Sequence, residues 1–309
     1  MPITIKASAK STCALGKLPD AHGSCLSDDH VNLISNYSGA AVDGLPSLRD
    51  ALGCKDDICV LTKAKLPEVV KNQITREALK ATADSLDGSY WMNNTEIDTC
   101  LSQMRIQFPG FAHTFIHMSD MVAIPPSNLN TYQYKVRGLS EINLGQCIAA
   151  ALKGKSCEQL STYKDVPLTS IGTIFNTDTS QGSGQHWFAV YISFDNVDVL
   201  EPSKKMVMIE VFNSSGLDIK SSTFQKFWEE QRLAIQKATG LRCEKKLIST
   251  IQHQRDDTGN CGSYSLFYIY SRLAGNPSEK FDESKVTDAK MQAFRKICFV
   301  KGGEGAFEF

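Results

Sequence analysis

Apolar residues recur along this chain with two different spacings. In some stretches they fall three or four positions apart, which predicts helices. Those stretches are residues 24–37, 45–54, 66–86, 95–108, 139–154, 221–240 and 286–299. In other stretches β-branched and aromatic residues run almost continuously, which predicts strands. Those stretches are residues 169–178, 186–194, 206–215 and 246–252.

The two patterns are unevenly distributed, which predicts two domains. Helical spacing alone occupies the first part of the chain, and "SLDGSYW" around Gly88 then breaks the pattern. A chain of 309 residues also exceeds the usual size of one domain. We therefore expect a helical N-terminal arm domain over residues 1–88 and a core domain over residues 89–309. Strands that are grouped together and flanked by helices predict the α+β class for this core.

One cysteine lies where a polar, turn-forming run becomes strongly apolar. "RDDTGN" has turn chemistry, and the residues after Cys261-Gly262 place apolar side chains at helical spacing. A thiol at the N-terminus of a helix has a lowered pKa, because free N–H groups and the helix dipole favour the thiolate. Cys261 is therefore a candidate nucleophile. The alternative is that Cys261 is a small buried hydrophobic residue at a helix start.

A thiolate nucleophile needs a histidine base and a group that orients the histidine. His186 opens the strand "HWFAVYISF" beside the loop "SQGSGQ", so its ring should stand at a strand end. The strand in "MVMIEVFNSSG" ends in Asn213, and the amide oxygen of this residue could accept the imidazole N–H if the two strands pair. Asp195 and Asp198 are competing orienting groups, and Asn213 could equally form an Asx turn.

Composition and charge narrow the function further. The 33 basic and 34 acidic residues give a formal charge of −1, so neither a nucleic acid nor a membrane surface is an expected partner. No membrane span or secretion signal is recognisable, which indicates an intracellular protein. We expect the ten scattered cysteines to be reduced, and Cys54 and Cys59 to be ordinary packing residues rather than metal ligands. No metal or other cofactor is expected.

The ordered set of motifs resembles a known family. "NTDTSQGSGQHWFAV", "EVFNSSG" and "IQHQRDDTGNCGSYSLFYIYSRL" resemble the adenovirus endopeptidase and SUMO-specific protease superfamily. The likeness is closer to the polyprotein-processing cysteine proteases of African swine fever virus and other large DNA viruses, and it extends to "SCLS" and "LGCKDDICV" near the N-terminus. The resemblance implies an α+β protease core with a central mixed sheet, preceded by a helical arm domain.

The resemblance also implies residue roles. Cys261 is the nucleophile, His186 the base, Asn213 its orienting residue, and Gln254 the side-chain donor to the oxyanion. "DDTGN" lacks a glutamine, so this chain departs from the pattern if that donor belongs nearer the cysteine. Substrate-binding candidates are Trp91, Asn176, Trp187 and Gly262; Trp187 could equally be plain core.

The implied activity is cleavage after Gly-Gly in Gly-Gly-Xaa sites of viral structural polyproteins during virion maturation, in the host cytoplasm and the virion. A ubiquitin-like or SUMO-type isopeptidase acting on host conjugates is the alternative, and a docking module without activity is a weaker one. The pair Gly302-Gly303 near the C-terminus raises the hypothesis that the enzyme trims its own tail. The oligomeric state stays open.

Overall fold

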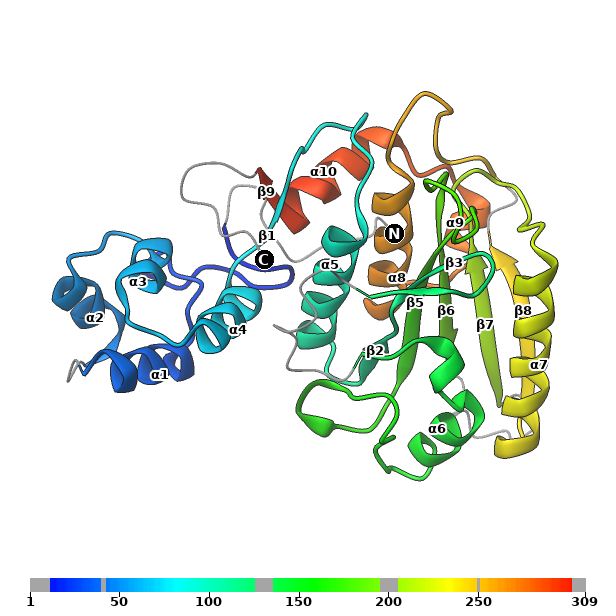
Figure 1. Ribbon diagram of the computed structural model, residues 1–309, viewed down its shortest axis with the longest axis horizontal. Helices are drawn as coiled ribbons and strands as arrows, with labels where there is room; N and C mark the ends of the chain where they lie inside the picture. The colour runs from blue at the N-terminus through cyan, green and yellow to red at the C-terminus, as the bar shows by residue number, and fades with distance from the viewer. Residues whose placement is uncertain (1–11, 40–42, 126–135, 195–204, 249–250, 302–309) are drawn as a thin grey trace. The chain divides into compact units, whose positions relative to one another are not determined.

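The computed structural model describes residues 12–39, 43–125, 136–194, 205–248 and 251–301, and the chain divides into two compact units (Figure 1). Residues 1–86 group with residues 293–309, and residues 87–292 form the second unit. The predicted boundary near Gly88 lies close to this division. The C-terminal segment, which was expected in the core domain, groups with the first unit because β9 (Phe299–Lys301) pairs in parallel with β1 (Ala81–Ala83). The proposed cleavage site at Gly302-Gly303 lies outside the described residues.

The first unit contains four short helices, α1 (Asp28–Ser38), α2 (Gly44–Leu52), α3 (Asp57–Lys63) and α4 (Glu68–Ala78). Ser27 caps α1 by accepting a hydrogen bond from the backbone N–H of His30, and Gly53 ends α2 in the left-handed conformation. Their apolar faces enclose a small core that includes Ile34, Leu48 and Ile74. The prediction of one helix over residues 66–86 was too long: α4 ends at Ala78, and the chain then extends to pair as β1.

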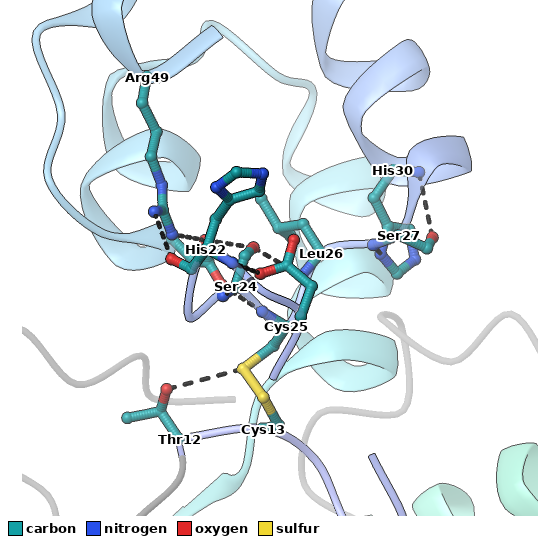
Figure 2. The surroundings of a disulfide bond; sticks show 11 residues. Thr12, Cys13, His22, Ser24, Cys25, Leu26, Ser27, His30 and Arg49 are labelled. Atoms are coloured by element: carbon teal, nitrogen blue, oxygen red, sulfur yellow. Dashed lines mark hydrogen bonds and ion pairs between the residues drawn. A yellow bond between two sulfur atoms is a disulfide. The ribbon is translucent and has the colours of Figure 1, made fainter. Parts of the chain in front are cut away.

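Six cysteines are paired in three disulfide bonds, Cys13–Cys25, Cys54–Cys59 and Cys147–Cys157. Figure 2 shows the first of them, with the Thr12 hydroxyl 3.7 Å from the Cys25 sulfur. The expectation of ten reduced cysteines is therefore wrong for these six. It rested on the rarity of disulfides in intracellular proteins, and the spacing of the cysteines along the chain carries no pairing information.

The second unit is built on a mixed sheet with strand order β4-β3-β5-β6-β7-β8, in which β2 also pairs with β5. The strands are β2 (Phe111–His113), β3 (Ile116–Met118), β4 (Ala123–Ile124), β5 (Ser170–Asn176), β6 (Trp187–Ser193), β7 (Met206–Phe212) and β8 (Arg242–Ile248). The pairs β5–β6 and β6–β7 are antiparallel, whereas β3–β5, β2–β5 and β7–β8 are parallel. The predicted strand over residues 246–252 in fact begins at Arg242, because the whole segment pairs with β7.

Helices cover both faces of this sheet (Figure 1). On one face, α6 (Leu144–Ala151) and α7 (Ser222–Thr239) pack on alternate strand residues in a core centred on Phe175, Phe188 and Trp228. Ser221 caps α7, and Gly240 ends it in the left-handed conformation. Short 3₁₀ turns, η2 (Leu139–Glu141) and η3 (Tyr163–Asp165), lie before and after α6 in the chain.

On the other face lie α5 (Asn94–Gln107) and α8 (Cys261–Leu273). The Tyr268 ring of α8 stacks on Phe212 of β7 with the centroids 4.5 Å apart. Gly172 of β5 allows close approach here, since an added Cβ would lie 2.8 Å from the Phe111 ring and 3.3 Å from Ile269. Two further helices follow in the chain, α9 (Lys280–Glu283) and α10 (Asp288–Cys298). In the described part of the chain, no helix has the length and apolar character needed to cross a membrane.

Candidate active site

Three strand ends meet at one edge of the sheet in the second unit. Asn176 ends β5 opposite Trp187, which opens β6, and Phe212 ends β7 opposite Ala189. Because β6 runs antiparallel to both neighbours, its first residues lie beside the last residues of β5 and β7. This register brings His186 and Asn213 to the same edge, although 27 residues separate them in the chain.

His186 and Asn213 form a short hydrogen bond. The distance between Nε2 of His186 and Oδ1 of Asn213 is 2.7 Å. An amide oxygen only accepts hydrogen bonds, so the imidazole proton resides on Nε2 and the lone pair on Nδ1. The ring is thereby held in the tautomer that can accept a proton from a thiol. Asp195 and Asp198, the competing orienting groups, lie outside the described residues.

The Asn213 side chain also shapes the turn that follows β7. Its Oδ1 accepts hydrogen bonds from the backbone N–H and the hydroxyl of Ser215, and its Nδ2 donates to the Leu217 carbonyl at 2.8 Å. The two interpretations of Asn213 left open by the sequence therefore coexist, because the residue both forms an Asx turn and contacts the imidazole. Asn213 is only 2% exposed, so these contacts are shielded from water.

Burial lowers the pKa of His186 below its ordinary value of 6.5, and the hydrogen bond to Asn213 opposes part of this effect. The physical cause is that the imidazolium loses hydration when it leaves water, whereas the neutral ring loses little. The imidazole is accordingly neutral at pH 7 and available as a base.

Cys261 is the first residue of α8, as the sequence predicted, and only 1% of its surface is exposed. Its neighbour Gly262 packs tightly: an added Cβ would lie 3.1 Å from Met92 Cβ and 3.4 Å from Trp187 Cδ1. Trp187 in turn donates its Nε1–H to the Met92 carbonyl at 3.0 Å. Gly262 and Trp187, the residues that follow Cys261 and His186, both contact Met92. The start of α8 and the start of β6 therefore lie together at this edge of the sheet.

Gln254 lies in the loop before α8 and is buried, at 8% exposure. Its Oε1 accepts the Ser214 hydroxyl at 3.0 Å, and its Nε2 donates to the Thr258 carbonyl at 2.6 Å. One hydrogen of the amide binds Thr258, and an amide NH₂ group carries a second hydrogen. Ser214 follows Asn213 directly, so the candidate oxyanion donor is tied to the candidate orienting residue.

A cavity of about 630 Å³ opens next to this edge. Its lining includes the predicted substrate-binding residues Trp91, Asn176 and Trp187, together with the apolar side chains of Met118 and Ile124. Gly262, the fourth predicted substrate-binding residue, does not line it but supports Trp187. The side chain of Asn176 accepts backbone N–H groups of Asp178 and Gln185, which fixes the loop before His186.

Two groups near Cys261 had no signal in the sequence. The Met92 carbonyl orients Trp187, and Asp288 accepts hydrogen bonds from the loop before Cys261. Both lie far along the chain from the residues that they contact. In the described residues, histidine, cysteine, aspartate and glutamate form no group of three or more that could hold a metal ion.

A scan against protein-family models finds no match. The chain is 26% identical over 258 residues to the cysteine protease of an African swine fever virus isolate from a tick in Malawi, covering 81% of this chain and 85% of the relative. A pig isolate from Kenya carries a relative with the same identity and coverage that is named a SUMO-1 cysteine protease. A crystal structure of the African swine fever virus protease has a TM-score of 0.62 at 22% identity, covering 96% of this chain and 98% of that one.

These similarities bear on three predictions. The resemblance to the African swine fever virus cysteine proteases, the α+β fold and the assignment as a cysteine protease are confirmed. The individual roles of His186, Asn213, Gln254 and Cys261 stay predictions.

Proposed function

We propose that this homologue of the African swine fever virus cysteine protease cleaves viral structural polyproteins after Gly-Gly in Gly-Gly-Xaa sites, in the host cytoplasm and the maturing virion. The sequence resemblance supports the substrate class, and the similarity to curated viral cysteine proteases supports the chemistry. The observation that carries the proposal is the hydrogen bond of 2.7 Å from His186 to Asn213. Cys261 begins a buried helix, and the next residue, Gly262, packs against Trp187, the residue after His186.

The first step of the reaction makes a tetrahedral intermediate. Nδ1 of His186 accepts the thiol proton of Cys261, and the thiolate attacks the carbonyl carbon of the scissile bond. The imidazolium is stabilised because its Nε2–H donates to Asn213. The negative oxygen of the tetrahedral intermediate receives hydrogen bonds from the backbone N–H of Cys261 and from Nε2 of Gln254. Such a donor is typically worth about 3 kcal/mol in the transition state.

The remaining steps form the acyl-enzyme and then return the enzyme to its starting state. His186 gives its proton to the leaving amine nitrogen as the C–N bond breaks, leaving a thioester on Cys261. Water then attacks the thioester while Nδ1 of His186 accepts a proton. The proton passes to the sulfur when the C–S bond breaks, and the new carboxyl terminus leaves.

The cavity beside Trp187 is the proposed binding site for the substrate residues that precede the scissile bond. Trp91 is 51% exposed on its rim, and Asn176 and the backbone around Gly184 offer polar groups. A mostly apolar cavity with a few placed polar groups suits an extended peptide segment.

A second candidate substrate is a ubiquitin-like conjugate that ends in Gly-Gly. One curated relative carries the name SUMO-1 cysteine protease, which favours this alternative. The chemistry would be unchanged, and only the acyl donor would differ.

The test compares wild type with Cys261→Ala on a purified polyprotein that contains Gly-Gly-Xaa sites and, separately, on a ubiquitin-like conjugate. The matched control is Cys243→Ala, because Cys243 is also buried and burial raises its pKa to about 12. We expect wild type and Cys243→Ala to cut after Gly-Gly, and Cys261→Ala to be inactive. Equal cleavage by Cys261→Ala would place the nucleophile elsewhere, and cleavage of the conjugate alone would favour the isopeptidase.

A further inference from the structure

The loop between Gln254 and Cys261 connects the two predicted donors of the oxyanion site, and it contains neither helix nor strand. Its first residue is fixed, because the backbone N–H and the side-chain oxygen of Gln254 both bind Ser214. Its last residue begins α8. The orientation of both donors, Gln254 and the backbone N–H of Cys261, therefore depends on the contacts that hold residues 255–260.

Asp288, about 30 residues further along the chain, holds those intervening residues. Its Oδ2 accepts the backbone N–H of Arg255 at 3.1 Å. Its Oδ1 accepts the Thr258 hydroxyl and Nδ2 of Asn260, each at 2.9 Å. One carboxylate thus binds the start, the middle and the end of the loop.

The contact with Asn260 has a direct consequence for Cys261. A carboxylate accepts but does not donate, so the Asn260 amide must present its NH₂ group to Asp288. An asparagine at a helix N-cap usually accepts a hydrogen bond from the first turn, but Asn260 makes no such side-chain bond. Its Oδ1 is buried without a hydrogen-bond partner in the described part of the chain. Asp288 therefore holds Asn260 away from the N–H groups that open α8.

We propose that Asp288 is a positioning residue of the protease: its carboxylate holds the 255–260 loop so that Gln254 and the backbone N–H of Cys261 face the carbonyl oxygen of the substrate. The inference rests on the proposed roles of Cys261 and Gln254 and extends them to a residue on another element. The carboxylate of Asp288 binds the loop residues Arg255, Thr258 and Asn260. Its effect passes through the loop.

The test uses Asp288→Asn in the full-length protein, with Asp257→Asn as the matched control. The first change keeps the side-chain volume but sets an NH₂ group against at least one of the three donors. The control removes a carboxylate from the same loop, where Asp257 forms an exposed ion pair with Arg255. Three quantities are measured: kcat and KM on a Gly-Gly-Xaa peptide, the affinity of a peptide aldehyde ending in Gly-Gly, and the rate of Cys261 alkylation by iodoacetamide.

Wrongly oriented oxyanion donors slow acyl transfer but do not change the reactivity of the Cys261 thiol. We expect Asp288→Asn to lower kcat roughly tenfold to a hundredfold, as misplacements near 1 Å do. KM should stay within about twofold, since uniform binding is unchanged. Aldehyde affinity should fall with kcat, because the aldehyde adduct also carries an oxygen in the oxyanion site, whereas alkylation should proceed at the wild-type rate. Thr258→Val, which removes one donor, should give a smaller loss of kcat.

Several results would overturn the inference. Wild-type kcat in both Asp288→Asn and Thr258→Val would remove the positioning role. An equal fall in alkylation and kcat would indicate general damage to the helix start, and an equal effect in Asp257→Asn would indicate loss of charge alone. If wild type itself neither cleaves the peptide nor is alkylated at Cys261, the proposed function fails and this inference fails with it.

Discussion

The side-chain oxygen of Asn213 accepts hydrogen bonds both from the His186 imidazole and from the turn that follows β7. It accepts from His186 and from two groups of Ser215, while Nδ2 binds the Leu217 carbonyl. The turn therefore fixes the amide before any substrate arrives, and the amide fixes the ring. A neutral amide can therefore hold the His186 ring in its catalytic orientation without placing a second charge in the site.

The pKa of His186 tests this arrangement. Burial lowers it below 6.5 and the Asn213 hydrogen bond raises it, so Asn213→Ala should lower the pKa further. Burial disfavours the charged form of His186 in the folded protein, so the unfolded state binds the extra proton. The free energy of unfolding should therefore fall as the pH drops from the His186 pKa of the unfolded state toward the lower pKa of the folded state. The imidazole can be titrated by NMR in a Cys261→Ala background, with and without Asn213→Ala. A higher pKa in the double variant would contradict the role of Asn213.

Gly262 gives a second prediction for a single residue. An added Cβ would meet Met92 Sδ at 3.2 Å and Met92 Cβ at 3.1 Å, closer than such contacts normally allow. Gly262→Ala should therefore displace Met92 or Trp187, at a cost of about 1–3 kcal/mol in stability. Thermal unfolding and kcat on a Gly-Gly-Xaa peptide measure the two effects. An unchanged melting temperature would show that Met92 moves freely.

At this scale, part of the candidate site could be predicted from the sequence. Cys261 lies at a change from turn to helix, and His186 and Asn213 lie at strand ends, so local patterns marked all three. The Met92 carbonyl and Asp288 could not be found this way. Their contacts join segments 95 and about 30 residues apart, and neither has a local pattern that differs from an ordinary loop or helix start.

At the scale of elements, β7 and α8 are tied by a buried charged network. Oε2 of Glu210 accepts the Tyr268 hydroxyl and Nε of Arg272, each at 2.8 Å, and the Arg272 guanidinium lies over the Tyr191 ring. Glu210 lies three residues before Asn213, and both Tyr268 and Arg272 belong to the helix that begins at Cys261. The network therefore holds the strand of the orienting residue against the helix of the nucleophile.

Removing the charge of Glu210 should destabilise the second unit. Glu210→Gln leaves the Arg272 guanidinium, whose side chain is 12% exposed, without its counter-ion, and loss of one partner of such a shielded pair typically costs about 3–5 kcal/mol. Glu279→Gln is the matched control, because its ion pair with Lys246 is exposed and should contribute less than about 1 kcal/mol. Urea unfolding of both variants measures the difference. Equal stabilities would mean that β7 and α8 are held by apolar packing alone.

The elements differ in how well the sequence predicted them. The strands β5, β6 and β7 are buried on both faces, so their apolar runs are nearly continuous and were recognised. Strand β8 alternates exposed and buried residues, and the prediction missed its first half. Strands β2, β3 and β4 and helix α3 were not predicted, because two to seven residues are too few to show a period.

At the scale of the whole molecule, disulfides and a candidate catalytic thiol occur in one chain. Cys13–Cys25 and Cys54–Cys59 lie in the first unit and Cys147–Cys157 in the second, while Cys100, Cys243, Cys261 and Cys298 form no disulfide bond in the described part of the chain. The four residues of the proposed mechanism all belong to the second unit. The pairing of β1 with β9, across more than 200 residues, is another feature that no local pattern in the sequence encodes.

This distribution predicts that the first unit can be weakened without loss of the chemistry. The Cys13–Cys25 bond closes a loop with a separation of 12 residues, and Cys13→Ser with Cys25→Ser should lower the unfolding free energy of the first unit by about 3 kcal/mol. Cleavage of a short Gly-Gly-Xaa peptide should be unchanged, since a small substrate needs only the second unit. Calorimetry and peptide kinetics measure the two effects. Alkylation of unfolded, unreduced protein should label four cysteines, and labelling of all ten would refute the bridges on which this prediction rests.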